Sequence, residues 1–440
     1  MRGGLLLAAA LLVAGCASTP HRPVAPPPPV KHVPKPPPAP PPPPPPRTAV
    51  ELGVVAGPPV SSLDITSENA ANALGAFRTS CKALLRRRDG SGLTRNDDWR
   101  PACDAAAAPG ANPATFFPLW FETAVVGPGT TFDTGYYEPE IEGSRTHDPG
   151  YDWPLYRRPP DLVEVDGGTV GGTPGTKRRG RMQDGSFVPY YERAEIDKGA
   201  LANQGLELAW VKDPYEAFFL EIQGSGRLIL PDGSIMRVGY DGQNGRDYTG
   251  IGSLMRQRGL IGQGTPFDTS MQGMMAWMRA YPDQARPVLE ENKSYVFFRE
   301  IVGPGPIGAL GVPVVGHVSV AADPNFVPLG APVWLKVDRA EVTGLWVAQD
   351  TGGAIKGANR FDTFWGSGIL ARLTAGGMSA RGQALILVPR GTIDRLRGAP
   401  TVTPTPSAPA PVVSAPAPAP VLPYAVPPPV TTSGGPPSRP

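Results

Sequence analysis

The chain has 440 residues, including 58 prolines and 54 glycines, and carries a formal net charge of +2. Because proline and glycine interrupt regular structure, this composition argues against an average helical enzyme. The 41 Lys and Arg residues are dispersed among 39 Asp and Glu residues, whereas nucleic-acid binding needs a concentrated basic surface. The four histidines are His21, His32, His147 and His317. No two of them have the spacing of zinc ligands, so we expect neither a metal nor another cofactor.

The first 16 residues have the pattern of an export signal. A basic start is followed by a short apolar run and by Val13-Ala14-Gly15-Cys16, and the run is too short to span a bilayer. The last four residues resemble a bacterial lipobox, in which the cysteine is acylated; the alternative is an ordinary signal peptide with a chance cysteine. Ala17 in place of an aspartate is similar to Gram-negative lipoproteins sorted to the outer membrane. We therefore expect a lipid anchor on the periplasmic face of that membrane.

Two proline-rich segments flank a middle of ordinary composition. Of the 58 prolines, 17 lie in residues 20–46 and 15 in residues 399–440. We expect residues 17–48 to form an extended polyproline II linker, with a disordered tail as the alternative. Residues 398–440 are expected to be a disordered Pro/Ala-rich tail. Both segments are candidates for contact with cell-wall proteins, and the middle is long enough for two packed domains.

The middle begins with two predicted helices, at residues 67–88 and 97–107. They carry Cys81 and Cys103, the only cysteines besides Cys16. Since an exported protein meets an oxidising compartment, we expect a disulfide between them across an αα-hairpin. Two reduced, buried thiols are the alternative.

Short strands dominate the rest of the middle. Runs rich in β-branched and aromatic residues predict strands at residues 206–211, 217–223, 227–230, 314–320, 333–337, 345–349 and 384–388. A further helix is predicted after Ser270, with Met274, Trp277 and Met278 on one face before Pro282. Because a long βαβ alternation is missing, we expect a mainly β body of the α+β class with helices at its periphery.

Carboxylates are the remaining candidates for chemistry, because histidine is scarce and the cysteines are expected to be bonded. Asp350 ends an apolar strand and precedes two glycines, and Asp362 lies twelve residues further on, with Lys356 between them. An aspartate before Gly-Gly is, by itself, more often a turn than an active site. Asp323 begins a third tight loop upstream.

Taken together, these three aspartates resemble the 3D region of the membrane-bound lytic murein transglycosylase A family. Asp133-Thr134-Gly135-Tyr136-Tyr137-Glu138-Pro139 is similar to the family's F-T-G-Y-Y-x-P signature. Further motifs of the family fit in order at residues 156–160, 221–226, 239–245, 270–272 and 295–298. The resemblance covers residues 130–390 and leaves out both proline-rich segments.

The resemblance implies a double-psi β-barrel with a smaller β domain inserted into it. We expect the barrel domain, with its N-terminal helices, to comprise residues 49–142 and 258–397. The inserted domain is expected at residues 143–257. A groove between the two domains would hold a glycan strand of peptidoglycan.

The resemblance also implies a lytic exotransglycosylase of cell-wall turnover, a carbon-oxygen lyase. Such an enzyme cleaves the β-1,4 bond between N-acetylmuramic acid and N-acetylglucosamine and leaves a 1,6-anhydro end. The sugar's own tethered 6-hydroxyl replaces the enzyme nucleophile, so a second carboxylate is not required. Asp362 would act as acid and then as base, with Asp350 close beside it. This role needs a protonated Asp362 near neutral pH, so the pKa of Asp362 has to lie above its ordinary value. Burial beside Phe364 and Trp365, or the negative charge of Asp350, would raise this pKa.

The candidate substrate-binding residues lie in several segments. They are Thr134, Tyr136, Gln223, Ser225, Gly226, Tyr240, Asn244, Tyr248 and Lys356. The tyrosines suit stacking on sugar rings, with core packing as the alternative. The amides of Gln223 and Asn244 suit N-acetyl groups, with a hydrogen-bonded turn as the alternative. Lys356 is assigned to glycan binding or to pairing with Asp350.

Two other functions remain open at this point. A hydrolytic glycosidase would use Asp350 and Asp362 as a carboxylate pair that activates water. A non-enzymatic peptidoglycan-binding lipoprotein would keep the groove without turnover, although such a protein has no evident need for a buried acid.

Overall fold

The computed structural model describes residues 46–173, 175–303 and 305–398. The predictions for Cys16, for the proline-rich linker up to residue 45 and for the tail from residue 399 lie outside these residues. Among the residues described, no helix is both long and apolar enough to cross a membrane.

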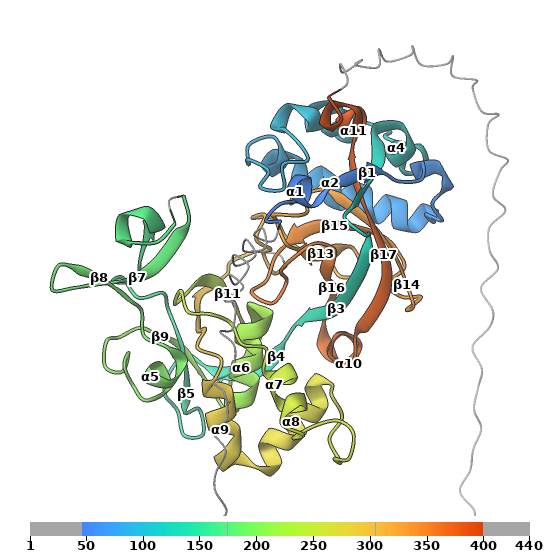
Figure 1. Ribbon diagram of the computed structural model, residues 1–440. Coiled ribbons are helices and arrows are strands. Elements are labelled where there is room, and N and C mark those ends of the chain that lie inside the picture. Colours follow the sequence, from blue (N-terminus) through green and yellow to red (C-terminus); the bar gives the residue numbers. More distant parts are fainter. Residues whose placement is uncertain (1–45, 174, 304, 399–440) are drawn as a thin grey trace, which may run out of the picture. The chain divides into compact units, whose positions relative to one another are not determined.

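An N-terminal group of helices packs around one aromatic cluster. The helices are α1 (Ala49–Leu52), α2 (Ser67–Leu84), α3 (Arg100–Ala107) and α4 (Pro113–Trp120), with 3-10 turns η1 (Val60–Ser62) and η2 (Asn96–Trp99) between them (Figure 1). The ring centre of Phe77 lies 5.3 Å from that of Phe121 and 6.2 Å from that of Trp99. All three rings are buried, so apolar burial fixes these helices against the strand that follows α4.

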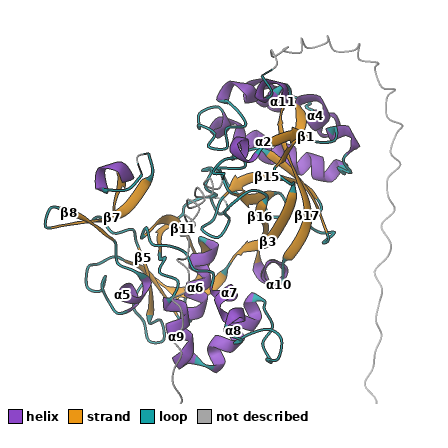
Figure 2. Cartoon of the chain, viewed as in Figure 1, coloured by secondary structure: helices purple, strands orange, loops and turns teal. Residues whose placement is uncertain are grey.

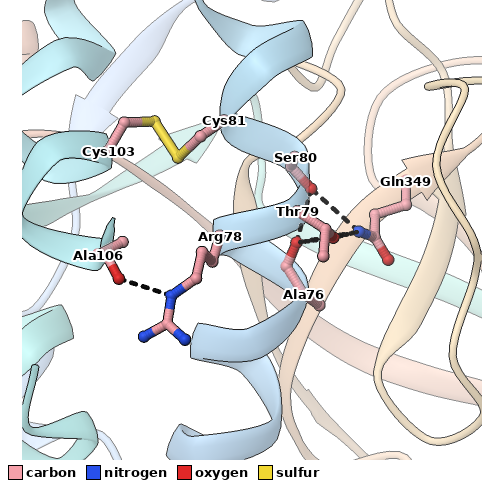
Figure 3. Close-up of a disulfide and its surroundings, with 8 residues drawn as sticks. All are labelled: Ala76, Arg78, Thr79, Ser80, Cys81, Cys103, Ala106 and Gln349. Carbon is pink, nitrogen blue, oxygen red and sulfur yellow. Dashed lines mark hydrogen bonds between the residues drawn. A yellow bond between two sulfur atoms is a disulfide. The ribbon is translucent and has the colours of Figure 1, made fainter. Parts of the chain in front are cut away.

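A disulfide and a buried amide hold α2 in place (Figure 3). Cys81 of α2 is bonded to Cys103 of α3, with 5.5 Å between their Cα atoms. On the other side of α2, the Gln349 side-chain amide donates to the carbonyl oxygen of Ala76 at 3.0 Å and to Ser80 Oγ at 3.0 Å. Its oxygen accepts from Ser319 Oγ at 2.5 Å. Because Gln349 is fully buried and immediately precedes Asp350, α2 supports the backbone that carries a candidate catalytic residue.

Eight strands form the first sheet, and six of them close into a ring. Their order is β1 (Val54–Ala56), β2 (Phe121–Val126), β17 (Ser379–Pro389), β14 (Pro332–Val337), β15 (Gly344–Asp350), β13 (Ser319–Ala322), β16 (Arg360–Ser367) and β3 (Thr130–Glu138). Since β17 pairs with β3 as well as with β14, the strands from β17 to β3 form a closed ring. Helix α10 (Gly368–Gly376) packs on β3 and β16, and Figure 2 distinguishes these strands from the helices.

Two smaller sheets lie in the middle of the sequence. The six-stranded sheet has the order β12 (Val296–Glu300), β11 (Ile235–Gln243), β10 (Ser225–Ile229), β4 (Glu140–Ser144), β9 (Glu207–Val211) and β5 (Trp153–Tyr156). The three-stranded sheet has the order β6 (Val163–Asp166), β7 (Lys177–Gln183) and β8 (Ser186–Pro189). The remaining elements are η3 (Gly167–Val170), α5 (Arg193–Asp197), α6 (Pro214–Gln223), α7 (Ile251–Gln257), α8 (Met271–Ala280), α9 (Pro282–Glu290) and α11 (Thr392–Leu396).

A buried ion pair ties two of these helices to the six-stranded sheet. Arg193 of α5 donates to both carboxylate oxygens of Glu221 of α6 at 2.9 Å. Glu221 also accepts from the backbone N–H of Val296 at 2.8 Å. Removing either charge would leave the other buried without its partner, which is costly. The end of α6 is therefore held firmly.

The predicted fold class, mainly β with peripheral helices, is confirmed. The predicted strands near residues 206–211, 333–337, 345–349 and 384–388 correspond to β9, β14, β15 and β17, and α8 is the helix expected after Ser270. The domain boundaries stay a prediction. The six-stranded sheet contains, besides strands of the 143–257 segment, the later strand β12 and the first residues of β4, which begins at Glu140.

The strand predicted at residues 217–223 is wrong, because this segment is the greater part of helix α6. Asp213 caps the helix by accepting hydrogen bonds from the N–H groups of Tyr215 and Glu216, Pro214 is the first helical residue, and Gly224 ends the helix in the left-handed conformation. These are standard start and stop signals of a helix. The apolar run misled the prediction because it is buried on most sides, which removes the helical periodicity.

The strand predicted at residues 314–320 is mostly wrong, because β13 begins only at Ser319. His317 has a φ of 62°, which interrupts an extended strand. A Cβ at Gly316 would lie 3.0 Å from the backbone nitrogen of Gly366. The chain therefore turns here to pass close to the end of β16.

Removal of the disulfide should destabilise the fold measurably. The bond closes a loop with a sequence separation of 22 residues, so a double Cys81→Ser, Cys103→Ser variant should lose about 3 kcal/mol of unfolding free energy. Equilibrium denaturation in urea measures this loss. In the presence of a reductant, wild type and variant should have the same stability; equal stability under oxidising conditions would contradict the prediction.

Candidate active site

The two aspartates of the candidate site lie on either side of one short strand. Ala321 of β13 is the cross-strand partner of Asp350 on β15 and of Asp362 on β16. Two strand spacings therefore separate the two backbones, roughly 10 Å. Both side chains are partly buried. The sheet thus places the two carboxyls in one region, although twelve residues of chain separate them.

Asp362 is held by groups from β3 and β16. These strands run parallel, and Thr134 is paired with Asp362. Thr134 Oγ1 donates a hydrogen bond to Asp362 Oδ1 at 2.5 Å and accepts one from Arg360 Nη2 at 2.9 Å. Because residues two apart in a strand share a face, Arg360 and Asp362 both meet the Thr134 hydroxyl. One hydroxyl therefore links a guanidinium to the carboxyl.

Asp350 is held by a separate set of donors. The backbone N–H groups of Ala309 and Thr351 both donate to its Oδ1 at 2.8 Å. The Tyr136 hydroxyl donates to its Oδ2 at 3.1 Å. Tyr136 is two residues after Thr134, so β3 contacts both aspartates from one face. The ring of Tyr136 packs on that of Phe364, with 4.8 Å between centres.

These surroundings raise the pKa of both carboxyls. Burial raises the pKa of Asp362 to about 6; the Thr134 hydrogen bond and the Arg360 charge oppose that rise, and the charge of Asp350 adds to it. Burial also raises the pKa of Asp350, opposed by the N–H groups of Ala309 and Thr351 and by the Tyr136 hydroxyl. An acid that titrates near 6 exists in both protonation states close to neutral pH, so it can donate a proton and later accept one.

Tyr248 and Lys356 differ in how they meet the site. Burial raises the pKa of the Tyr248 phenol, and the charge of Asp362 raises it further, so Tyr248 lies within the field of that carboxylate. A Cβ at Gly353 would lie 3.7 Å from Tyr248 Cγ, which places the ring against the loop that joins the aspartates. Lys356 is exposed, and its predicted pairing with Asp350 is not among the ion pairs of the described residues.

The residues at the end of α6 contact β3 through one amide. Gln223 Oε1 accepts from the backbone N–H of Tyr137 at 3.0 Å, which connects this end of the helix to the strand bearing Thr134. Ser225 is partly buried. A Cβ at Gly226 would lie 2.3 Å from Leu220 Cδ1 and 3.1 Å from the carbonyl oxygen of Pro139, so packing against these two residues favours a glycine there.

Tyr240 and Asn244 make no contact with the two aspartates among the interactions of the described residues. Tyr240 is 46% exposed, and burial raises its pKa while Arg179 lowers it. The Asn244 amide donates to the carbonyl oxygens of Tyr191 and Lys293 at 2.8 Å, and its oxygen accepts from the N–H of Tyr295 at 3.0 Å. This buried amide is satisfied by backbone groups, which favours the hydrogen-bonded turn over N-acetyl recognition.

Asp323 supports the loop between the aspartates. Its Oδ2 accepts from the backbone N–H of Gly357 at 2.8 Å, and its Oδ1 accepts from that of Asn325 at 3.0 Å. It is buried, so its contribution is to hold two loops together.

Two polar residues near Asp362, Arg360 and Asp133, were not predicted from the sequence to be functional. Asp133 begins the quoted motif at residues 133–139, and Arg360 lies between Lys356 and Asp362. The importance of both depends on the register of β3 against β16. Asp133 is fully buried. Strand alternation in the motif would have placed Arg360 on the face of Asp362. The part of the chain that the structure describes contains no cluster of three or more His, Cys, Asp or Glu residues that could hold a metal ion.

Comparisons with known proteins give consistent relatives. A family model for the MltA specific insert domain matches residues 132–299, and one for the 3D domain matches residues 318–388. The chain is 33% identical over 265 residues to membrane-bound lytic murein transglycosylase A of Escherichia coli K12, which covers 58% of this chain and 64% of that protein. It is 30% identical over 280 residues to the Vibrio cholerae protein of that name, covering 60% of this chain and 68% of the relative.

The solved structures similar to this chain include proteins of the same family. The membrane-bound lytic murein transglycosylase from Agrobacterium tumefaciens has a TM-score of 0.67 and 32% identity, covering 75% of this chain and 95% of that one. Escherichia coli MltA with bound chitohexaose has a TM-score of 0.55 and 26% identity, covering 76% of this chain and 93% of that one.

Thr134→Val should raise the pKa of Asp362 above about 6. The substitution removes a hydrogen bond that stabilises the carboxylate, so the protonated form gains relative to it. Carbon-13 NMR titration of the aspartate side chains measures the shift. Thr115→Val, at an exposed position of α4, is the matched control and should leave the titration unchanged. An unaltered or lower pKa in Thr134→Val would show that the hydroxyl does not stabilise the carboxylate.

Proposed function

The chain belongs to the membrane-bound lytic murein transglycosylase A family, and we propose that it is a peptidoglycan lytic transglycosylase. It cleaves the β-1,4 bond between N-acetylmuramic acid and N-acetylglucosamine and leaves a 1,6-anhydro end. The proposal rests on the environment of Asp362, a partly buried carboxyl whose pKa is raised to about 6 and which Thr134 and Arg360 hold in place. The matched segment spans 64% of the Escherichia coli K12 relative.

Asp362 is proposed to act twice in the reaction. As an acid it gives its proton to the glycosidic oxygen, and the bond between that oxygen and the anomeric carbon breaks. The 6-hydroxyl of the same sugar attacks the anomeric carbon, and its proton passes to the Asp362 carboxylate. The acid is thereby regenerated, and no water is consumed. Tethering gives the hydroxyl a large effective concentration, so the enzyme needs no nucleophile of its own.

The neighbours of Asp362 have distinct proposed roles. Thr134 orients the carboxyl through its 2.5 Å hydrogen bond, and Arg360 orients Thr134. Asp350, fixed by two backbone N–H groups, adds negative charge that favours the protonated form of Asp362 and the cationic transition state of the sugar. Tyr136 fixes Asp350.

The glycan is proposed to lie between the ring and the end of α6. Tyr248 stacks on a sugar ring, and Gln223, Ser225 and Gly226 line the groove from the inserted domain, with Lys356 available to the glycan from the exposed loop. We propose residues 49–142 and 258–397 as the catalytic domain and 143–257 as the inserted domain, whose sheet β12 of the later segment extends. The bound chitohexaose of the Escherichia coli neighbour supports a polysaccharide substrate.

The protein is proposed to act at a membrane in a Gram-negative periplasm. The names of its relatives contain the term membrane-bound, and the lipobox-like sequence ending at Cys16 suits a lipid anchor in the outer membrane. The N-terminal proline-rich linker would then connect the catalytic body to that anchor, and both proline-rich segments are available for contact with cell-wall proteins.

Asp362→Asn should lose activity by roughly 100-fold to 10,000-fold, because an amide cannot donate or accept the proton. Mass spectrometry of digested peptidoglycan gives the readout: the wild type should release muropeptides lighter by one water than their reducing counterparts. Asp394→Asn, at an exposed position of α11, is the matched control and should retain full activity.

Three results would contradict the proposal in different ways. Reducing ends in place of anhydro ends would indicate a hydrolytic glycosidase that uses Asp350 and Asp362 as a pair. No release by the wild type would indicate a binding protein. Full activity of Asp362→Asn would remove Asp362 from the mechanism.

Turnover should fall as pH rises through about 6. Asp362 must enter the reaction protonated, and the protonated fraction declines above its raised pKa. The measurement is kcat against pH between 4 and 9. In Thr134→Val, where the pKa of Asp362 is expected to rise, the midpoint of this decline should move to higher pH. Activity that stays constant from pH 5 to 8 would mean that Asp362 is not the acid.

A further inference from the structure

A second aspartate, Asp133, lies on β3 next to the residue that binds Asp362. Asp133 precedes Thr134 on β3, and its side chain is 0% exposed. Its register partners are Phe361 of β16 and Ala380 of β17, both apolar. Asp133 Oδ2 lies 3.1 Å from Thr363 Oγ1. Its other oxygen, Oδ1, has no hydrogen-bond partner among the described residues. An ionised carboxylate in such a place would be poorly compensated.

The Thr363 hydroxyl is surrounded by three polar groups. Besides Asp133 Oδ2, it lies 3.0 Å from the carbonyl oxygen of Thr134 and accepts from Trp365 Nε1 at 3.1 Å. A hydroxyl has one proton to donate and two lone pairs that accept. When the Thr363 hydroxyl donates its proton to the Thr134 carbonyl oxygen, it has no proton left for Asp133. The contact between Thr363 and Asp133 is then a hydrogen bond only if Asp133 is protonated and donates to the hydroxyl oxygen. All three contacts are then satisfied at once.

We propose that Asp133 is a neutral, proton-bearing positioning residue: it donates to Thr363, which holds the backbone of Thr134 and so keeps the Thr134 hydroxyl on Asp362. The catalytic part of this inference rests on the proposed function. Asp133 does not touch the substrate. It acts through Thr363 and Thr134.

The electrostatics of the site agree with a neutral Asp133. Burial raises the pKa of Asp133 to about 8, and the charge of Asp362 adds to the rise, while the Thr363 hydrogen bond and the charge of Arg360 oppose it. These are the charged groups that act on it, and both lie on β16. On β17 its register neighbour, Ala380, carries no charge. Asp133 should therefore stay protonated at the pH where Asp362 works.

The first test compares melting temperatures of wild type and Asp133→Asn between pH 4 and 9. An acid with a raised folded-state pKa contributes stability that is complete below its unfolded value and is lost as pH rises through the folded value. The melting temperature of wild type should therefore fall relative to that of Asp133→Asn as the pH rises from 4. Above about pH 8 the difference between the two melting temperatures should stay constant. A constant difference across this range would show that Asp133 is an ordinary ionised aspartate and would overturn the proposal.

The second test separates positioning from space filling. Asp133→Asn keeps a donor for Thr363 and should keep kcat within about threefold of wild type, whereas Asp133→Leu keeps volume but no donor and should lower kcat by about tenfold or more with little change in KM. If Asp133→Leu does not fold, Thr363→Val removes the same connection and should have the same effect on kcat. Equal kcat in the Asn variant and in the donor-free variant would overturn the positioning role.

The two tests also separate this inference from the proposed function. The melting comparison needs no substrate, so it remains decisive if wild type releases no anhydro muropeptides. If wild type is active and the melting difference is flat, the proposed function stands and the inference fails.

Discussion

The pairing of β3 with β16 is the constraint on which the site depends. It sets Thr134 opposite Asp362, so one hydroxyl can meet the carboxyl and the Arg360 guanidinium. The start of β16 is fixed by Asn359, whose carbonyl accepts from the Phe132 N–H at 3.1 Å and from Thr131 Oγ1 at 2.8 Å. A slip of one residue would turn these side chains to the other face of the ring, with Asp133 taking the place of Thr134.

The closed ring makes this register hard to change. β3 is paired with β16 on one side and with β17 on the other, and β13 holds β15 and β16 on either side of Ala321. Moving one strand would therefore disturb two ladders. The N-terminal helices add to this rigidity, because α2 binds Gln349 next to Asp350 and is itself bonded to α3. The pKa of a partly buried acid depends on the position of its neighbours, so a rigid framework keeps that pKa constant.

The sequence predicted the features that depend on neighbouring residues. Runs rich in β-branched and aromatic residues predicted β14, β15 and β17. The pair of cysteines on two predicted helices of an exported protein predicted the disulfide that the structure contains. Helix α6 could also have been predicted from local sequence, because Asp213 and Pro214 mark its start and Gly224 marks its end. The apolar run between them favoured a strand instead. Features set by strands distant in the chain were not predictable in this way. The roles of Arg360 and Asp133 depend on the register of β3 against β16. The use of Asn244 as a buried backbone link depends on Tyr191 and Lys293, two loop residues distant in the chain.

The folded ring raises the pKa of the Asp362 carboxyl to a value suited to proton transfer in both directions. The most direct measurement is the titration of the Asp362 side chain in the wild-type protein by carbon-13 NMR, assigned by comparison with Asp362→Asn. We expect a midpoint of about 6. A midpoint near the ordinary aspartate value of about 3.9 would contradict it, because Asp362 would then be ionised throughout the neutral range and unable to act as the acid.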